Sequence, residues 1–121
     1  MTQVGAAIAY SGVLYNAAGS VLTILRAFKD VTGLGDTELV PAEPGKRIRV
    51  IALAIQAGLA VTVRLKSAGN NISASFALAL NDDFVLPANE HGWFETNVNE
   101  ALTLNASAIA TTGVQLVYVL V

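Results

Sequence analysis

The sequence predicts an all-β protein, built as an antiparallel β-sandwich. Short runs of alternating apolar and polar residues recur along the chain, and residues 101–121 place apolar side chains at every second position. Turn residues separate these runs at intervals close to the roughly 8–12 residues typical of sandwiches and barrels. The length of 121 residues fits one domain. We therefore expect an extended N-terminal arm over residues 1–20 and a single β-sandwich domain over residues 21–121.

The predicted arm is small and uncharged, with glycines spaced through it. Tyr10, Val13, Leu14 and Tyr15 give it apolar surface to bury, so we expect these residues to contact another subunit or a partner. The alternative is a frayed terminal tail, which is common at chain ends. If the arm serves as a contact, deleting residues 1–18 should leave the β domain folded and weaken binding to the partner.

Residues 20–32 fit two interpretations. Ser20 could cap a helix that ends at Gly33, with Val21, Leu25 and Phe28 on one face. The same residues also alternate as a strand would. The β-rich remainder of the chain favours the strand.

The apolar run over residues 47–56 is predicted to be a central strand. It follows a short strand over 37–40 and a turn over 41–45, where the prolines lack a ladder donor and the glycine permits a positive φ. Both of its faces become apolar, as in a strand that is covered on both sides. Its faces are expected to be Ile48 with Val50 and, on the other side, Arg49 with Ile51, Leu53 and Ile55.

The remaining strands alternate more simply. Residues 61–66 should bury Val61, Val63 and Leu65 and leave the other face wet. Further strands are expected over residues 84–86, 92–96 and 101–105, and an inward row is expected to contain Phe76, Leu78 and Leu80.

The last strand, over residues 114–121, is apolar on both faces, with Val117 and Val119 in one row. An exposed edge strand of this kind would promote aggregation. It is therefore expected to lie centrally in its sheet or against another subunit, and Val117 and Val119 are candidate subunit contacts.

Composition favours burial of part of the surface in an assembly. Charged residues make up 13% of the chain, about half of the usual share of roughly 25%. Hydrophobic residues make up 54%, and the mean hydropathy is +0.57. The net charge of −2 argues against a nucleic-acid partner, which would require a surplus of Lys and Arg. The low charge and high hydrophobic content lead us to expect a homo-oligomer. We expect no membrane segment, because polar residues interrupt the uncharged C-terminal run.

The chemistry-bearing residues predict no enzyme. Residues 89–104, NEHGWFETNVNEALTL, hold the only histidine and tryptophan. No motif places a nucleophile or an orienting group beside His91, so we interpret this stretch as a loop that enters a strand anchored by Trp93. Asp82 and Asp83 form a solvated turn or, less readily, part of a calcium site, which usually needs six or more oxygens. The absence of cysteine excludes a cysteine nucleophile and thiolate metal sites. Because no other motif supports a site, we expect no catalytic, metal or cofactor residues.

Basic residues gather at the start of the long strand. Arg47 and Arg49 are expected to project from the same strand face, next to Lys46. They mark either a solvated strand start or an ion-pair contact with an acidic partner surface. Arg64 and Lys66 could extend this patch.

The order of several segments resembles a known class of proteins. The segments PAEPGKRIRVIAL, VTVRLKS, LPANEHGWFET, EALTLNAS and GVQLVYVLV are similar to small β-sandwich virion proteins of tailed bacteriophages. The likeness is greatest to capsid decoration (cement) proteins with a jelly-roll-like fold, and it covers about residues 37–121.

This resemblance implies a structural protein of the virion. Such proteins bind the outside of an icosahedral head as homotrimers, clamp neighbouring major capsid subunits and strengthen the shell, and their terminal arms often contact the capsid. Related modules also occur in phage fibres and tail tips. The alternative function is therefore recognition of a host surface glycan or protein, for which Trp93 would be the residue to test.

Overall fold

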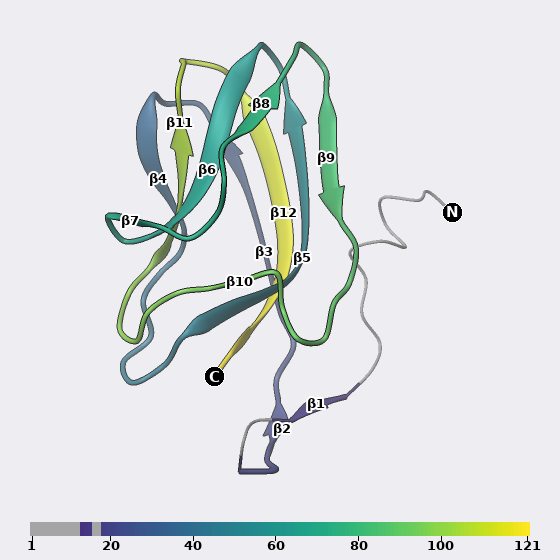
Figure 1. Ribbon diagram of the computed structural model, residues 1–121, viewed down its shortest axis with the longest axis vertical. Coiled ribbons are helices and arrows are strands. Elements are labelled where there is room, and N and C mark those ends of the chain that lie inside the picture. The colour runs from purple at the N-terminus through teal and green to yellow at the C-terminus, as the bar shows by residue number, and fades with distance from the viewer. Residues whose placement is uncertain (1–12, 16–17) are drawn as a thin grey trace.

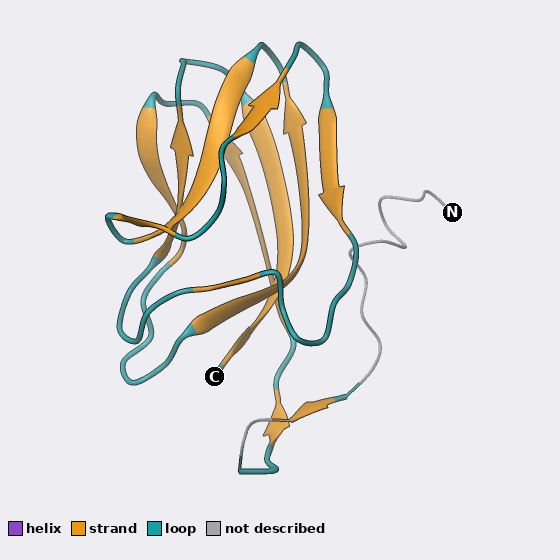
Figure 2. Ribbon diagram, viewed as in Figure 1, coloured by secondary structure: helices purple, strands orange, loops and turns teal. Residues whose placement is uncertain are grey.

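The computed structural model describes residues 13–15 and 18–121, and these form two antiparallel sheets that pack face to face (Figures 1 and 2). The first sheet contains β3 (Leu25–Val31), β12 (Thr112–Leu120), β5 (Ile48–Ala57), β9 (Asp83–Leu86) and β10 (Phe94–Glu95). The second sheet contains β4 (Gly35–Val40), β11 (Leu102–Ala106), β6 (Val61–Ser67), β7 (Asn70–Asn71) and β8 (Phe76–Leu78). The described residues include no helix, and so none that could cross a membrane.

The strand order is that of a jelly roll, which confirms the predicted fold class. The first sheet runs β3-β12-β5, with β9 and β10 sharing the free edge of β5; the second runs β4-β11-β6, with β7 and β8 sharing the free edge of β6. The chain crosses between the sheets at each step from β3 to β6, and again from β8 to β9, from β10 to β11 and from β11 to β12. Residues 25–31 are a strand, and the apolar last strand lies centrally in its sheet, as predicted.

The core between the sheets follows from the alternation in the strands. In β6, Val61, Val63 and Leu65 are buried, as predicted. The residues between them, on the face predicted to be wet, are half-buried. β11 contributes Leu102 and Leu104 in the same way, and β12 contributes Val114 and Leu116. These residues belong to one buried cluster that joins the inner faces of both sheets.

A β-bulge in β5 overturns the predicted division of that strand into two faces. Val117 of β12 pairs with Ala52, whereas the next residue, Tyr118, pairs with Val50, so Ile51 is an extra residue in β5. The bulge shifts the alternation by one position, because both Ile51 and Ala52 turn away from the core. Inward residues are therefore Ile48 and Val50 before the bulge, and Leu53 and Ile55 after it.

Leu80 does not join the inward row of Phe76 and Leu78. Strand β8 ends at Leu78, and Asn81 has a positive φ of 64° that reverses the chain. The prediction was wrong at this position because the strand is shorter than its apolar pattern.

A short N-terminal hairpin contributes Leu14 to a second buried cluster, which lies on the outer face of the first sheet. It pairs β1 (Leu14–Tyr15) with β2 (Val21–Leu22). Leu14 is buried in one cluster with Ile51, Ala52, Val117 and Val119. The predicted arm thus contributes at least Leu14 to the packing of the domain itself.

Candidate binding surfaces

Four turns at one end of the sandwich each present an exposed aliphatic side chain. They are the β3–β4, β5–β6, β8–β9 and β11–β12 turns, which lie together at the top of Figure 1. The side chains are Leu34, Leu59, Leu80 and Ile109, which are 63%, 54%, 58% and 75% exposed. We call these four residues the apolar end.

Backbone hydrogen bonds join three of the four turns of the apolar end. Gly58 N donates to Thr111 O at 2.8 Å, which joins the β5–β6 turn to the β11–β12 connection. Asn81 N donates to Ala57 O at 2.8 Å, which joins the same region to the β8–β9 turn. A Cβ at Gly58 would lie 2.7 Å from Thr111 O, so the close approach requires glycine.

The charges around the apolar end have one sign. Residues 32–37, 57–61, 79–84 and 106–113 contain three aspartates and no lysine or arginine. Asp36 is paired with Lys66, so Asp82 and Asp83 supply the unpaired charge. Asp82 helps to shape its own turn, because its Oδ2 accepts a hydrogen bond from Ala79 N at 2.7 Å. The surface is therefore an apolar tip with a weakly acidic border.

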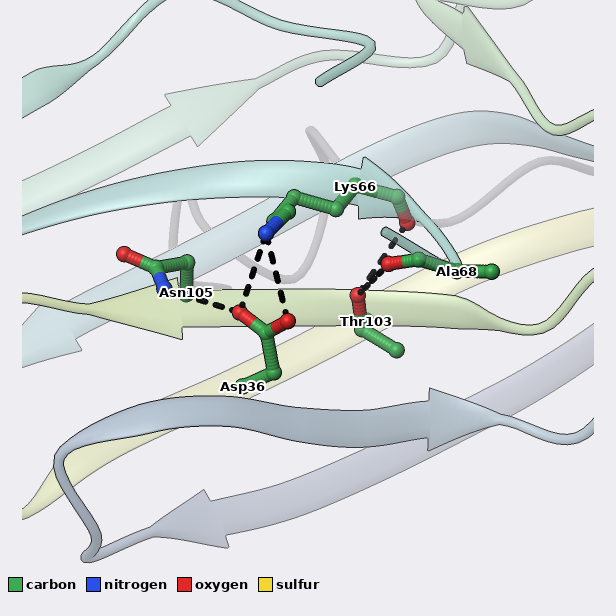
Figure 3. Close-up of polar contacts among 5 residues, drawn as sticks. All are labelled: Asp36, Lys66, Ala68, Thr103 and Asn105. Carbon is green, nitrogen blue, oxygen red and sulfur yellow. Dashed lines mark hydrogen bonds and ion pairs between the residues drawn. The ribbon is translucent and has the colours of Figure 1, made fainter. Parts of the chain in front are cut away.

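The outer face of the second sheet is polar, and several of its side chains bond to one another or to the backbone (Figure 3). Asp36 accepts hydrogen bonds from Asn105 Nδ2 at 2.8 Å and from Lys66 Nζ at 3.2 Å. The Asn105 bond is the main cause of a lowered pKa at Asp36, and Lys66 adds to it against the opposing effect of burial. Thr103 Oγ1 donates to the carbonyls of Lys66 and Ala68. The exception is Arg64 of β6, whose Nε is buried without a hydrogen-bond partner among the described residues.

The predicted contact residues of the arm divide between two faces of the hairpin. Tyr10 lies outside the described residues. Leu14 faces inward and is buried, whereas Val13 and Tyr15 are exposed. Tyr15 pairs across the hairpin with Val21, which is also exposed. Val13, Tyr15 and Val21 thus form an outward apolar patch, which we call the hairpin patch.

Val117 and Val119 are buried within the chain itself. They are 2% and 0% exposed, and they belong to the same cluster as Leu14. A direct contact between these valines and another subunit would require the N-terminal segment to leave the sheet. The free surface predicted here is therefore not present in the folded chain.

The basic cluster is smaller than expected. Arg49 Nε lies 2.8 Å from Glu95 Oε1 across the β5–β10 pair, so its charge is matched within the chain. Arg47 is exposed just before β5, where its backbone pairs with Val121. Arg64 and Lys66 belong to the second sheet and do not extend the cluster.

Residues of the His91 and Trp93 stretch have structural partners. The His91 side chain is exposed at the tip of a loop, and Trp93 Nε1 donates to Pro87 O at 2.7 Å. Glu100 accepts hydrogen bonds from Ser67 Oγ at 2.6 Å and from Asn97 Nδ2 at 3.0 Å, which lower its pKa. Among the described residues, no group of three His, Cys, Asp or Glu side chains could hold a metal ion.

Sequence reasoning missed the apolar end. Leu34, Leu59 and Ile109 each stand alone in a short polar or glycine-containing segment, and a single exposed aliphatic residue is ordinary. The signal is that every turn at this end carries one. That signal becomes visible only when the topology shows which turns are neighbours.

Comparisons with known proteins show no family. No protein-family model and no curated protein matches the chain. Among solved structures, the chain is similar to one described as "Bacillus endospore appendages form a novel family of disulfide-linked pili", with a TM-score of 0.45 and 15% identity. The match covers 88% of this chain and 95% of that chain. At this distance, the likeness assigns neither a family nor a function.

Proposed function

We propose that this protein is a structural subunit that binds the outside of a phage capsid as an oligomer, most simply a trimer, and stabilises the shell. The observation that carries the proposal is the apolar end: four exposed aliphatic side chains on four neighbouring turns. A protein that acts alone rarely presents such a group, because larger exposed apolar patches mark interaction sites. The resemblance to capsid decoration proteins supplies the identity of the partner.

The chemistry of the apolar end describes the surface that it would meet. Burial of apolar area contributes about 25 cal/mol per Å², before the losses of freedom on association are subtracted. The aspartates at its border favour a partner whose own border carries Lys or Arg. Two copies meeting through this end would instead bring like charges together, so we assign the end to the capsid.

The hairpin patch offers a separate surface for contacts between copies. Figure 1 places the N-terminal hairpin and the four turns at opposite ends of the molecule. One end can therefore face the capsid while Val13, Tyr15 and Val21 pack against another subunit. The two contacts can be tested independently because they share no residue.

Two sets of substitutions separate the contacts. Leu59→Ser, Leu80→Ser and Ile109→Ser combined should abolish cosedimentation with empty phage heads that lack this protein and should leave the oligomer intact. Val13→Ser, Tyr15→Ser and Val21→Ser combined should yield monomers in size exclusion with light scattering. Both sets change exposed residues, so circular dichroism should show an unchanged fold.

A wild-type protein that stays monomeric at micromolar concentration and does not sediment with heads would refute the proposal. If the wild type binds heads and the triple variant at Leu59, Leu80 and Ile109 binds them equally well, the protein binds capsids through a surface other than the apolar end.

A further inference from the structure

A shallow groove of about 410 Å³ lies on the outer face of the first sheet. None of its lining residues belongs to the buried cluster that contains Leu14. The groove exists because the two central strands present small residues there. Ala54 of β5 and Gly113 of β12 form a low floor, while Phe28 of β3 and Val85 of β9 stand on either side. Small-molecule sites commonly occupy clefts of about 300–1,000 Å³.

Strand register places two rows of side chains across this groove. The first row runs through paired positions on four strands: Phe28, Gln115, Ala54 and Val85. The second row, one step along, is Asp30, Gly113, Gln56 and Asp83. An aromatic ring, two amides and two carboxylates are therefore set around one small-residue floor.

These groups are free to bind a ligand. Phe28 is 84% exposed, more than any other large apolar residue in the described part of the chain. The side chains of Gln56, Gln115, Asp30 and Asp83 have no hydrogen-bond partner among the described residues, unlike those on the second sheet in Figure 3. Nothing within the described fold accounts for an aromatic ring kept in water beside unengaged amides.

We propose that this groove binds a neutral saccharide, with a sugar ring stacked on Phe28 and its hydroxyls hydrogen-bonded to Gln56 and Gln115. One face of a pyranose ring carries C–H groups that pack on an aromatic ring, and its hydroxyls both donate and accept. Amides match this pattern because each offers a carbonyl acceptor and two donors, while carboxylates accept from hydroxyls. A purely apolar ligand does not fit this groove, because it would leave the two amides and two carboxylates without hydrogen-bond partners.

Charge narrows the class of ligand. Asp30 and Asp83 face the groove against a single cation, Lys29, so phosphorylated or sulfated polymers would be repelled. The site is also distinct from Trp93, whose indole N–H is already bonded to a backbone carbonyl. The proposal goes beyond capsid binding, since the groove shares no residue with the apolar end or the hairpin patch.

A glycan microarray probed with the labelled full-length protein tests the proposal. We expect binding to neutral oligosaccharides, which isothermal titration then quantifies for variants. Phe28→Ala should weaken binding by at least about tenfold, whereas Phe28→Tyr should retain it within about threefold because the ring remains. Ala54→Leu should also abolish binding, because it fills the floor and leaves the platform in place.

Matched controls keep the result interpretable. Leu34→Ser removes another exposed apolar side chain, at the apolar end, and should leave saccharide affinity unchanged. The proposal is overturned by an array without neutral glycan signals, or by binding that survives both Phe28→Ala and Ala54→Leu. Neither result bears on capsid cosedimentation, so the two proposals fail separately.

Discussion

Ile48 and Thr96 hold each other by two hydrogen bonds, one in each direction. Ile48 N donates to the Thr96 hydroxyl at 2.9 Å, and Thr96 N donates to Ile48 O at 2.9 Å. Thr96 is fully buried, at the point where the chain leaves β10. Its side chain therefore satisfies a buried backbone donor at the start of β5.

Replacing this hydroxyl should destabilise the fold. Thr96→Val keeps the shape but leaves the Ile48 N–H buried without a partner, which costs about 1–3 kcal/mol. Thr96→Ser keeps the hydroxyl and loses one methyl group, for about 0.8 kcal/mol. Urea unfolding should therefore rank the wild type above the serine variant and the valine variant last. A valine variant as stable as wild type would contradict this role.

Leu14 and Tyr15 are adjacent in sequence, but their replacement should change the free energy of unfolding by very different amounts. Leu14→Ala should lower the free energy of unfolding by about 2–4 kcal/mol, because it opens a cavity in the outer-face cluster. Tyr15→Ala changes an exposed side chain and should stay within about 0.5 kcal/mol. Equal effects in chemical denaturation would show that Leu14 is not packed on the sheet. By the same reasoning, deletion of residues 1–18 should destabilise the domain, contrary to the expectation from sequence.

Gly92 is required for two reasons, whereas Gly45 is required for one. Both have a positive φ, of 81° and 75°, so alanine at either should cost about 1–2 kcal/mol in backbone strain. A Cβ at Gly92 would also overlap the side chain of Arg49, and nothing lies within 4 Å of one at Gly45. Gly92→Ala should therefore be the more destabilising in thermal unfolding. The excess should disappear in an Arg49→Ala background, and an excess that remains would rule out the clash.

The pKa of Asp36 should respond to the loss of Asn105. Asn105→Ala should raise it toward its ordinary value of 3.8, because the hydrogen bond from the Asn105 amide is the largest single cause of the lowered pKa. Because the folded state lowers this pKa, Asp36 favours folding above its unfolded pKa, and this contribution is lost as the pH falls through the folded pKa. Carboxyl carbon shifts in an NMR titration measure the value directly. An unchanged pKa of Asp36 in the Asn105→Ala variant would contradict this role of the amide.

Alternation predicted the strands well where one face is wet. β6 is the clear case, because polar residues separate Val61, Val63 and Leu65 and so fix which side faces the core. β5 gave no such reference: both faces are apolar, so the extra residue at Ile51 left no trace in the pattern. Tertiary contact, absent from the local sequence, decides the facing of such a strand.

The candidate surfaces were harder to predict than the fold. Val117 and Val119 are apolar enough for a subunit contact, yet a segment about a hundred positions earlier in the chain shares their cluster. Phe28 was recognised as part of a strand or helix face, but its neighbours Ala54 and Val85 come from strands far away in sequence. Surfaces assembled from distant segments require the topology, which alternation alone does not supply.

The central place of β12 has a consequence for synthesis of the protein. β3 and β5 do not pair with each other; each pairs with β12. During translation, the backbone N–H and C=O groups that β3 and β5 present to β12 stay unpaired until Thr112–Leu120 have been synthesised. Pairing between segments so far apart in sequence is slow. Nascent chains stalled before this strand would expose two unmatched edges, which makes them natural clients for chaperones and poor candidates for C-terminal truncation.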